Sequence, residues 1–178
     1  MQRVMPLLIV MLVILVGCNK DEANSEVYNG RDLIIGILGE EPDIREKNVK
    51  FEKLSFAELE QNIEENSSEF DAIFIMPEVL VEAADDRYVS VYQDLKIPIF
   101  FIESTKAHLP FVHENVTYET APEVGGDANY ATGYLFSGTE EEYRDDVWYY
   151  NLYNDIKNEA TIKDVYSRIF DTIEQISL

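Results

Sequence analysis

Three short apolar runs constrain the fold of this chain more than any other feature of its sequence. They are Leu33–Leu38, Phe70–Met76 and Ile97–Ile102, and the second is uncharged from Ala72 onward. Apolar runs of this length, bounded by glycine, proline or polar residues, are typical of strands that are buried on both faces. The sequence therefore predicts that these three runs are adjacent strands of one sheet.

Helical patterns separate the apolar runs and follow the last of them. Ser55 and Glu58 form a capping box, in which each side chain accepts from the other residue's backbone amide at a helix start. Thr139 and Glu142 repeat that pattern. Helices are thus expected to start at Ser55, to cover 78–95 in two pieces with a break at 85–86, to cover 139–157, and to start at Thr161.

Strands alternating with helices predict a three-layer α/β domain with a mostly parallel sheet of four or five strands, in a flavodoxin-like or similar arrangement with helices on both faces. Residues 49–54 read as a half-buried edge strand, and 130–136 as a further strand. Only about ten residues, 39–48, join the first two strands, fewer than a parallel crossover usually needs. Either this pair is antiparallel or a short helical turn at 42–47 joins it.

The chain is strongly acidic. It carries 35 acidic and 14 basic residues, which gives a formal net charge of −21 at pH 7. This charge excludes nucleic acid as a partner, because proteins bind phosphate backbones mainly through Lys and Arg. It favours cations or a basic protein, and the alternative is that the charge serves only to keep the surface soluble.

The amino terminus has the pattern of a targeting segment. Arg3 precedes an uncharged apolar run, Met5–Val16, which has the length of a signal-peptide core and is shorter than the roughly 20 residues of a membrane-spanning helix. Cys18 follows and is the sole cysteine, so an internal disulfide and a cysteine zinc site are both excluded. The alternative is a plain signal anchor in which the cysteine has no role.

Leu15-Val16-Gly17-Cys18 resembles the lipobox of bacterial lipoproteins. The resemblance implies that the Cys18 sulfur receives a diacylglycerol and that signal peptidase II cleaves before it. We expect a signal peptide at 1–17, a lipid-anchored polar linker at 18–31 and one α/β domain at 32–178, held on the outer face of the cell membrane. In general terms the domain is similar to uncharacterised small α/β lipoproteins of Gram-positive bacteria, which implies no activity.

Candidate ligand-binding residues follow the predicted strands. In open α/β sheets, ligands bind beyond the carboxyl ends of the strands, where this chain has Glu40, Glu78, Glu103 and Ser104. Carboxylates that converge there can perform acid–base chemistry or bind hard cations. The alternative is that each glutamate only begins the next helix, where the helix dipole favours it.

The motifs of nucleophilic catalysis and of cofactor binding are absent from the sequence. There is no G-x-S-x-G or G-x-G-x-x-G run. Ser104 is the best-placed hydroxyl, with His108 or His113 as its candidate base. We assign no catalytic residue from the sequence, and we expect neither a metal nor a cofactor.

An aromatic cluster gives a second candidate surface. Aromatic residues are frequent from Tyr130 to Tyr153, and aromatic side chains supply much binding area at low entropic cost. In the helix expected over 139–157, the stripe that faces the sheet would comprise Tyr143, Val147, Tyr150 and Asn154. Trp148 and Tyr149 would then point sideways or outward, as candidate binding residues.

The sequence thus favours a lipid-anchored, non-enzymatic module that binds a protein or a small ligand outside the cell. One alternative is a hydrolase or transferase acting on envelope material, with a carboxylate- or serine-based site at the strand ends. Another is a structural or cation-binding surface protein. A pocket lined by carboxylates at the strand ends is the feature that separates these hypotheses most directly.

Overall fold

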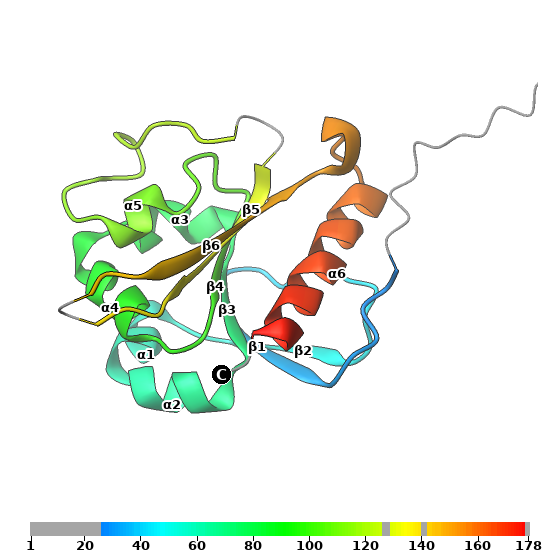
Figure 1. Cartoon of the computed structure of the whole chain (residues 1–178), viewed down its shortest axis with the longest axis horizontal. Coiled ribbons are helices and arrows are strands. Elements are labelled where there is room, and N and C mark those ends of the chain that lie inside the picture. Colours follow the sequence, from blue (N-terminus) through cyan, green and yellow to red (C-terminus); the bar gives the residue numbers. More distant parts are fainter. Residues whose placement is uncertain (1–25, 126–128, 140–141, 177–178) are drawn as a thin grey trace, which may run out of the picture.

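The sheet has six strands, and helices lie on its two faces (Figure 1). A computed structural model describes residues 26–125, 129–139 and 142–176. The strands are β1 (Leu33–Leu38), β2 (Val49–Lys53), β3 (Ala72–Ile75), β4 (Ile99–Ile102), β5 (Asn129–Phe136) and β6 (Asp145–Asn151). The helices are α1 (Phe56–Gln61), α2 (Ile63–Glu69), α3 (Leu80–Ala83), α4 (Val89–Asp94), α5 (Leu109–Val112) and α6 (Glu159–Gln175).

The strand order is β2-β1-β3-β4-β5-β6. Strands β1 to β4 pair in parallel, whereas β5 is antiparallel to β4 and to β6. The three apolar runs form β1, β3 and β4, which are neighbours in the sheet and buried along almost their whole length. The prediction for these three strands is therefore confirmed.

The expected fold class is wrong. We predicted a mostly parallel sheet of four or five strands in a three-layer, flavodoxin-like arrangement, but the sheet is mixed and has six strands. Its β4–β5–β6 end is antiparallel. The error arises in the segment 139–157, which was assigned to a helix.

That segment forms β6 because its residues alternate between the two faces of the sheet. Trp148 packs against the buried cluster beneath α6, whereas the next side chain, Tyr149, lies on the opposite face near His108. Valine, tryptophan and tyrosine favour strands. The expected capping bond does form, since the Thr139 hydroxyl accepts from the Glu142 amide at 3.2 Å, but it lies in the β5–β6 connection.

The connection between β1 and β2 follows neither of the two expected routes. The strands are parallel, and 39–48 contain no helical turn. This segment instead packs against α6. Asp43 forms an ion pair with Lys163, and the Arg45 guanidinium donates a hydrogen bond to the Ser167 hydroxyl. The short crossover is therefore stabilised by side-chain contacts to α6.

Most of the expectations for single helices and for the edge strand are confirmed. The Ser55–Glu58 capping box is present, and β2 is an edge strand. Residues 77–94 form two helical pieces that separate at 84–85. The last helix, however, begins at Glu159, because the Asn158 side chain caps it and Thr161 is its third residue.

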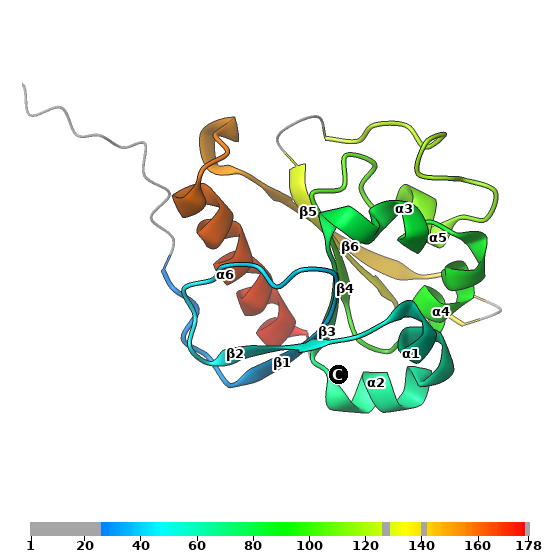
Figure 2. The ribbon, with the colours of Figure 1, turned by 180° about the vertical axis from the view of Figure 1, so that it is seen from behind.

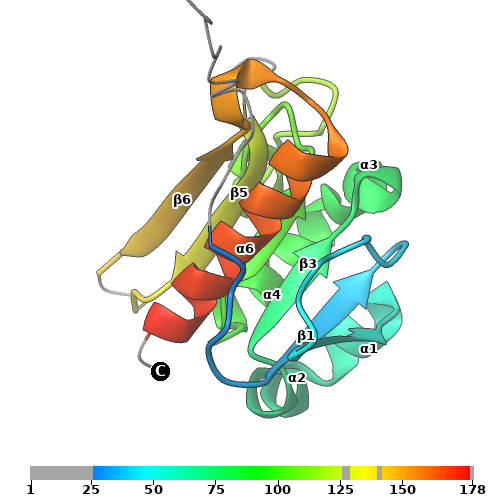
Figure 3. The same ribbon diagram turned by 90° about the vertical axis from the view of Figure 1, so that its right-hand side faces the viewer.

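Each face of the sheet has its own buried cluster. Helix α6 packs on one face, whose centre is Phe74, with the rings of Phe100, Tyr166 and Phe170 within 5.4–6.2 Å of it (Figure 3). Helices α1, α3, α4 and α5 pack on the other face (Figure 2). The alternation of side chains along β1, β3 and β4 thus fills both clusters.

Candidate functional site

The carboxyl ends of β1, β3 and β4 lie along one edge of the sheet. Because these strands are parallel, the residues that follow them are brought to the same edge. β5 is antiparallel to β4, so Tyr130 near its start also lies at this edge. The first turns of α6 reach it from the face that the helix covers (Figure 1).

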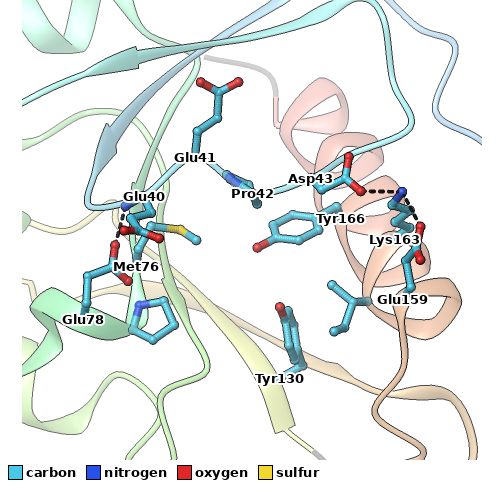
Figure 4. Close-up of a pocket in the computed structure, with 12 residues that line it drawn as sticks. Glu40, Glu41, Pro42, Asp43, Met76, Glu78, Tyr130, Glu159, Lys163 and Tyr166 are labelled. Carbon is cyan, nitrogen blue, oxygen red and sulfur yellow. Dashed lines mark hydrogen bonds and ion pairs between the residues drawn. The ribbon is translucent and has the colours of Figure 1, made fainter.

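A pocket of about 470 Å³ lies at this edge (Figure 4). Its carboxylates are Glu40, Glu41, Asp43, Glu78 and Glu159. Its apolar walls are Pro42, Met76, Pro77 and Ile162, and its remaining members are Tyr130, Tyr166 and Lys163. We call it the strand-end pocket. Its volume falls within the range of roughly 300–1,000 Å³ that is usual for small-molecule sites.

The backbone at Gly39 positions Glu78 in the pocket. Gly39 has a φ of +114°, which L side chains rarely adopt, and a Cβ there would clash with Glu78 Oε1. The Glu78 carboxylate accepts from the Glu40 backbone amide. A glycine at the end of β1 therefore allows the carboxylate that follows β3 to reach the end of β1.

Tyr130 and Tyr166 lie at the centre of the pocket, between the Glu40–Glu78 side and the Lys163 side (Figure 4). They are 6% and 1% exposed, and their rings meet edge to face at 6.1 Å. Burial raises the pKa of Tyr130 to about 12, and burial with the Tyr130 contact raises that of Tyr166 further. Both phenols are neutral at pH 7, so these two largely buried side chains line the pocket without adding charge.

The only lysine among the pocket residues is already paired. Lys163 Nζ lies 2.8 Å from Asp43 and 2.8 Å from Glu159, and these two hydrogen bonds raise its pKa. The five carboxylates and one ammonium of the pocket leave a formal charge of −4. Glu40, Glu41 and Glu78 are the carboxylates that no lysine of the pocket neutralises.

The structure separates the residues that the sequence proposed for binding. Glu40 and Glu78 lie in the strand-end pocket, whereas Glu103 lies in an adjoining hollow. Trp148 and Tyr149 lie on opposite faces of β6, away from both. Cys18 lies outside the described residues.

The geometry does not favour Ser104 as a nucleophile. Ser104 is fully buried, and its hydroxyl donates to the Ala107 carbonyl at 2.8 Å, which closes a turn after β4. His108 stacks on Tyr134, and burial lowers its pKa. His113 is exposed at the end of α5. No hydrogen bond among the described residues joins Ser104 to either histidine.

Sequence reasoning missed Tyr130, Asp43 and the α6 residues of the pocket. Glu159 and Lys163 lie one turn apart on α6, and Tyr166 follows three residues later, a spacing that places all three on one side of the helix. That spacing was visible in the sequence. Its relation to the strand ends was not, because it depends on how α6 crosses the sheet.

Within residues 26–125, 129–139 and 142–176, no three histidine, aspartate, glutamate or cysteine side chains converge as a metal site would require. None of the helices in these ranges has both the length and the apolar character needed to cross a membrane. No family model, curated protein or solved structure matches the chain. The site must therefore be interpreted from its own chemistry.

The buried tyrosines predict a loss of stability at alkaline pH. Burial raises the pKa values of Tyr28, Tyr130 and Tyr150 to about 12, whereas an unfolded tyrosine titrates near pH 10. Between these values the unfolded chain has lost protons that the folded chain retains, so the free energy of unfolding should fall as the pH rises from about 10 to 12. Urea unfolding followed at several pH values measures this, and constant stability across that window would contradict it.

Proposed function

We propose that this chain is a lipid-anchored binding module that holds a small organic cation in the strand-end pocket, outside the cell. The observation that carries the proposal is the pocket's composition: five carboxylates surround two tyrosine rings, and the one lysine is paired. Within the part of the chain that the structure describes, Ser104 is not hydrogen-bonded to His108 or His113, so binding is the activity that this geometry supports best.

Each part of the pocket suits one part of an alkyl ammonium ion. Unneutralised carboxylates attract the charge, and the accessible part of the Tyr130 ring adds a cation–π attraction of about 0.5–2 kcal/mol that depends on how far the site excludes water. Met76, Ile162 and the two prolines provide apolar contact for a short alkyl chain. An anion would meet a formal charge of −4 and would be repelled.

Binding of n-pentylamine tests this proposal. We expect saturable binding by calorimetry, weakened by salt, and none for pentanoate, which has the same chain and the opposite charge. Replacing both Glu40 and Glu78 by glutamine should weaken the amine about tenfold, which corresponds to about 1.4 kcal/mol.

The matched control removes two charges elsewhere. The double variant Glu60→Gln, Glu64→Gln also removes two negative charges, from exposed carboxylates of α1 and α2. If this control weakens n-pentylamine as much as the pocket variant does, binding follows the net charge of the protein and the pocket assignment is wrong. Absence of saturable binding to the unaltered protein contradicts the proposal itself.

The anchor is proposed from the lipobox. We expect Cys18→Ala to abolish labelling by a fatty-acid analogue and to release or mislocalise the protein, because the two acyl chains that give stable attachment are lost. Ser25→Ala, seven residues further on, leaves the lipobox intact and serves as the control. Label retained by the Cys18 variant would show that the lipid is not on this residue.

A further inference from the structure

A second hollow lies against the strand-end pocket and shares Tyr130 with it. It has a volume of about 290 Å³, and its polar residues include Glu103, Asn129, Asp155 and Lys157. We call it the Lys157 hollow. Tyr130 lines both cavities, so one ring separates the acidic strand-end pocket from a neighbouring site with two further carboxylates.

The Lys157 hollow already binds an ammonium group, that of the protein itself. Lys157 Nζ forms an ion pair with the Glu103 carboxylate and lies 5.9 Å from the centre of the Tyr130 ring. A carboxylate beside an aromatic face is the environment that binds ammonium ligands. The Lys157 side chain is 56% exposed, and ion pairs at that exposure contribute little stability, so an incoming ammonium can displace this one.

Asn129 is a further polar residue that lines the hollow. It is 6% exposed, and its Nδ2 donates to the Ser104 carbonyl and to the Thr132 hydroxyl, which fixes the orientation of the amide. Its Oδ1 is buried and accepts no hydrogen bond from any described residue. Buried acceptors are nearly always paired, so Asn129 has hydrogen-bonding capacity that no described residue uses.

The backbone around the hollow is strained. Glu103 and Asp155 line it with φ values of +56° and +57°, and Asn154 beside them has a φ of +51°. Non-glycine residues seldom adopt this left-handed conformation, and such residues concentrate at ligand sites and switch segments. Two of them, Asn154 and Asp155, lie three and two residues before Lys157, close to the side chain whose ammonium would be displaced.

We infer that the Lys157 hollow is a second ammonium subsite, and that the ligand is a linear diamine or polyamine that binds on both sides of Tyr130. The inference rests on the proposed function, since it places the ligand's first ammonium in the strand-end pocket. The second ammonium takes the place of Lys157 Nζ against Glu103 and the Tyr130 ring. Lys157 thereby competes with the ligand and moves into solvent when the ligand binds.

Two amines of equal chain length separate the two sites. n-Pentylamine carries one ammonium and reports on the strand-end pocket, whereas 1,5-diaminopentane carries two. We expect the diamine to bind about tenfold more tightly than the monoamine, a difference of about 1.4 kcal/mol. Glu103→Gln should remove most of this advantage and weaken n-pentylamine much less, since Glu103 is not among the residues that line the strand-end pocket.

Lys157→Gln gives the more distinctive result. Removing the competing ammonium should raise the affinity for 1,5-diaminopentane about three- to tenfold and change that for n-pentylamine much less. Lys96→Gln is the matched control, because Lys96 is exposed and precedes β4, at the opposite edge of the sheet from Glu103. It should leave the ratio of the two affinities unchanged.

The outcomes distinguish this inference from the proposed function. If n-pentylamine binds but the diamine binds no more tightly, or if Lys157→Gln alters both affinities equally, the second subsite is wrong and the strand-end pocket stands. If neither amine binds the unaltered protein, both proposals are overturned. Urea unfolding of each variant establishes that folding is intact, which we expect because Lys157 is exposed and Glu103 only half-buried.

Discussion

Replacing Phe74 by alanine should lower the free energy of unfolding by about 3–5 kcal/mol, the usual cost of removing a buried phenylalanine ring. Phe74 is fully buried in β3, a central strand of the sheet. Its ring lies 5.4 Å from Phe100 and 6.2 Å from both Tyr166 and Phe170. A cavity here has aromatic walls from two elements, β4 and α6, and rings held by separate elements cannot move together to fill it.

Urea unfolding at pH 7 measures this loss. Val81→Ala is the control, since the Val81 side chain on α3 is 67% exposed and its truncation should cost less than about 0.5 kcal/mol. A loss below about 1 kcal/mol for the Phe74 variant would mean that α6 does not close over β3 as described.

Glu46→Ala should also be strongly destabilising, by about 2–4 kcal/mol. The Glu46 carboxylate is fully buried and accepts from the Ser167 hydroxyl, which itself accepts from the Arg45 guanidinium at 2.8 Å. Removing the carboxylate leaves Ser167 without this acceptor. The usual cost of breaking a buried pair is about 3–5 kcal/mol, and it is reduced here because the Arg45 side chain is 25% exposed.

This contact also holds part of the strand-end pocket in place. Glu46 joins the 39–48 segment to α6, and that segment carries three of the pocket carboxylates. The Glu46 variant should therefore bind n-pentylamine more weakly as well as being less stable. Lys47→Ala changes the exposed neighbouring residue and should affect neither quantity. Full amine affinity in the Glu46 variant would show that the pocket does not depend on this contact.

The central strands could be predicted because burial on both faces leaves a continuous apolar sequence. Ala72–Ile75 and Ile99–Ile102 contain no polar position, and few structures other than a covered central strand place every side chain of such a run away from water. The capping box at Ser55 was equally clear, since both of its hydrogen bonds are local. Features that depend only on residues close together in the sequence could therefore be predicted.

The antiparallel end of the sheet was not predictable in the same way. In 139–157, a threonine three residues before a glutamate has the pattern of a helix start, and Tyr143, Val147 and Tyr150 have helical spacing. The same residues suit a strand, and pairing with β5 decides between the two. That pairing depends on contacts between segments, so local patterns favoured the wrong element.

The candidate site could be predicted only in part, because some of its residues are brought together by contacts between distant segments. The rule that ligands bind beyond strand carboxyl ends led to Glu40 and Glu78, which do line one pocket. Tyr130 was assigned to a strand but not to this edge, because only an antiparallel β5 starts here. Tyr166 and Lys163 required the position of α6 across the sheet, which no local pattern encodes.

Nuclear magnetic resonance of the protein saturated with n-pentylamine tests the central claim most directly, because it locates the ligand. We predict nuclear Overhauser contacts between the alkyl protons of the amine and the ring protons of Tyr130 and Tyr166, together with shifts of the Glu40 and Glu78 carboxyl carbons. Contacts centred instead on Trp148 or Tyr149 of β6, or shifts spread evenly over the acidic surface, would contradict a cation site at the strand ends.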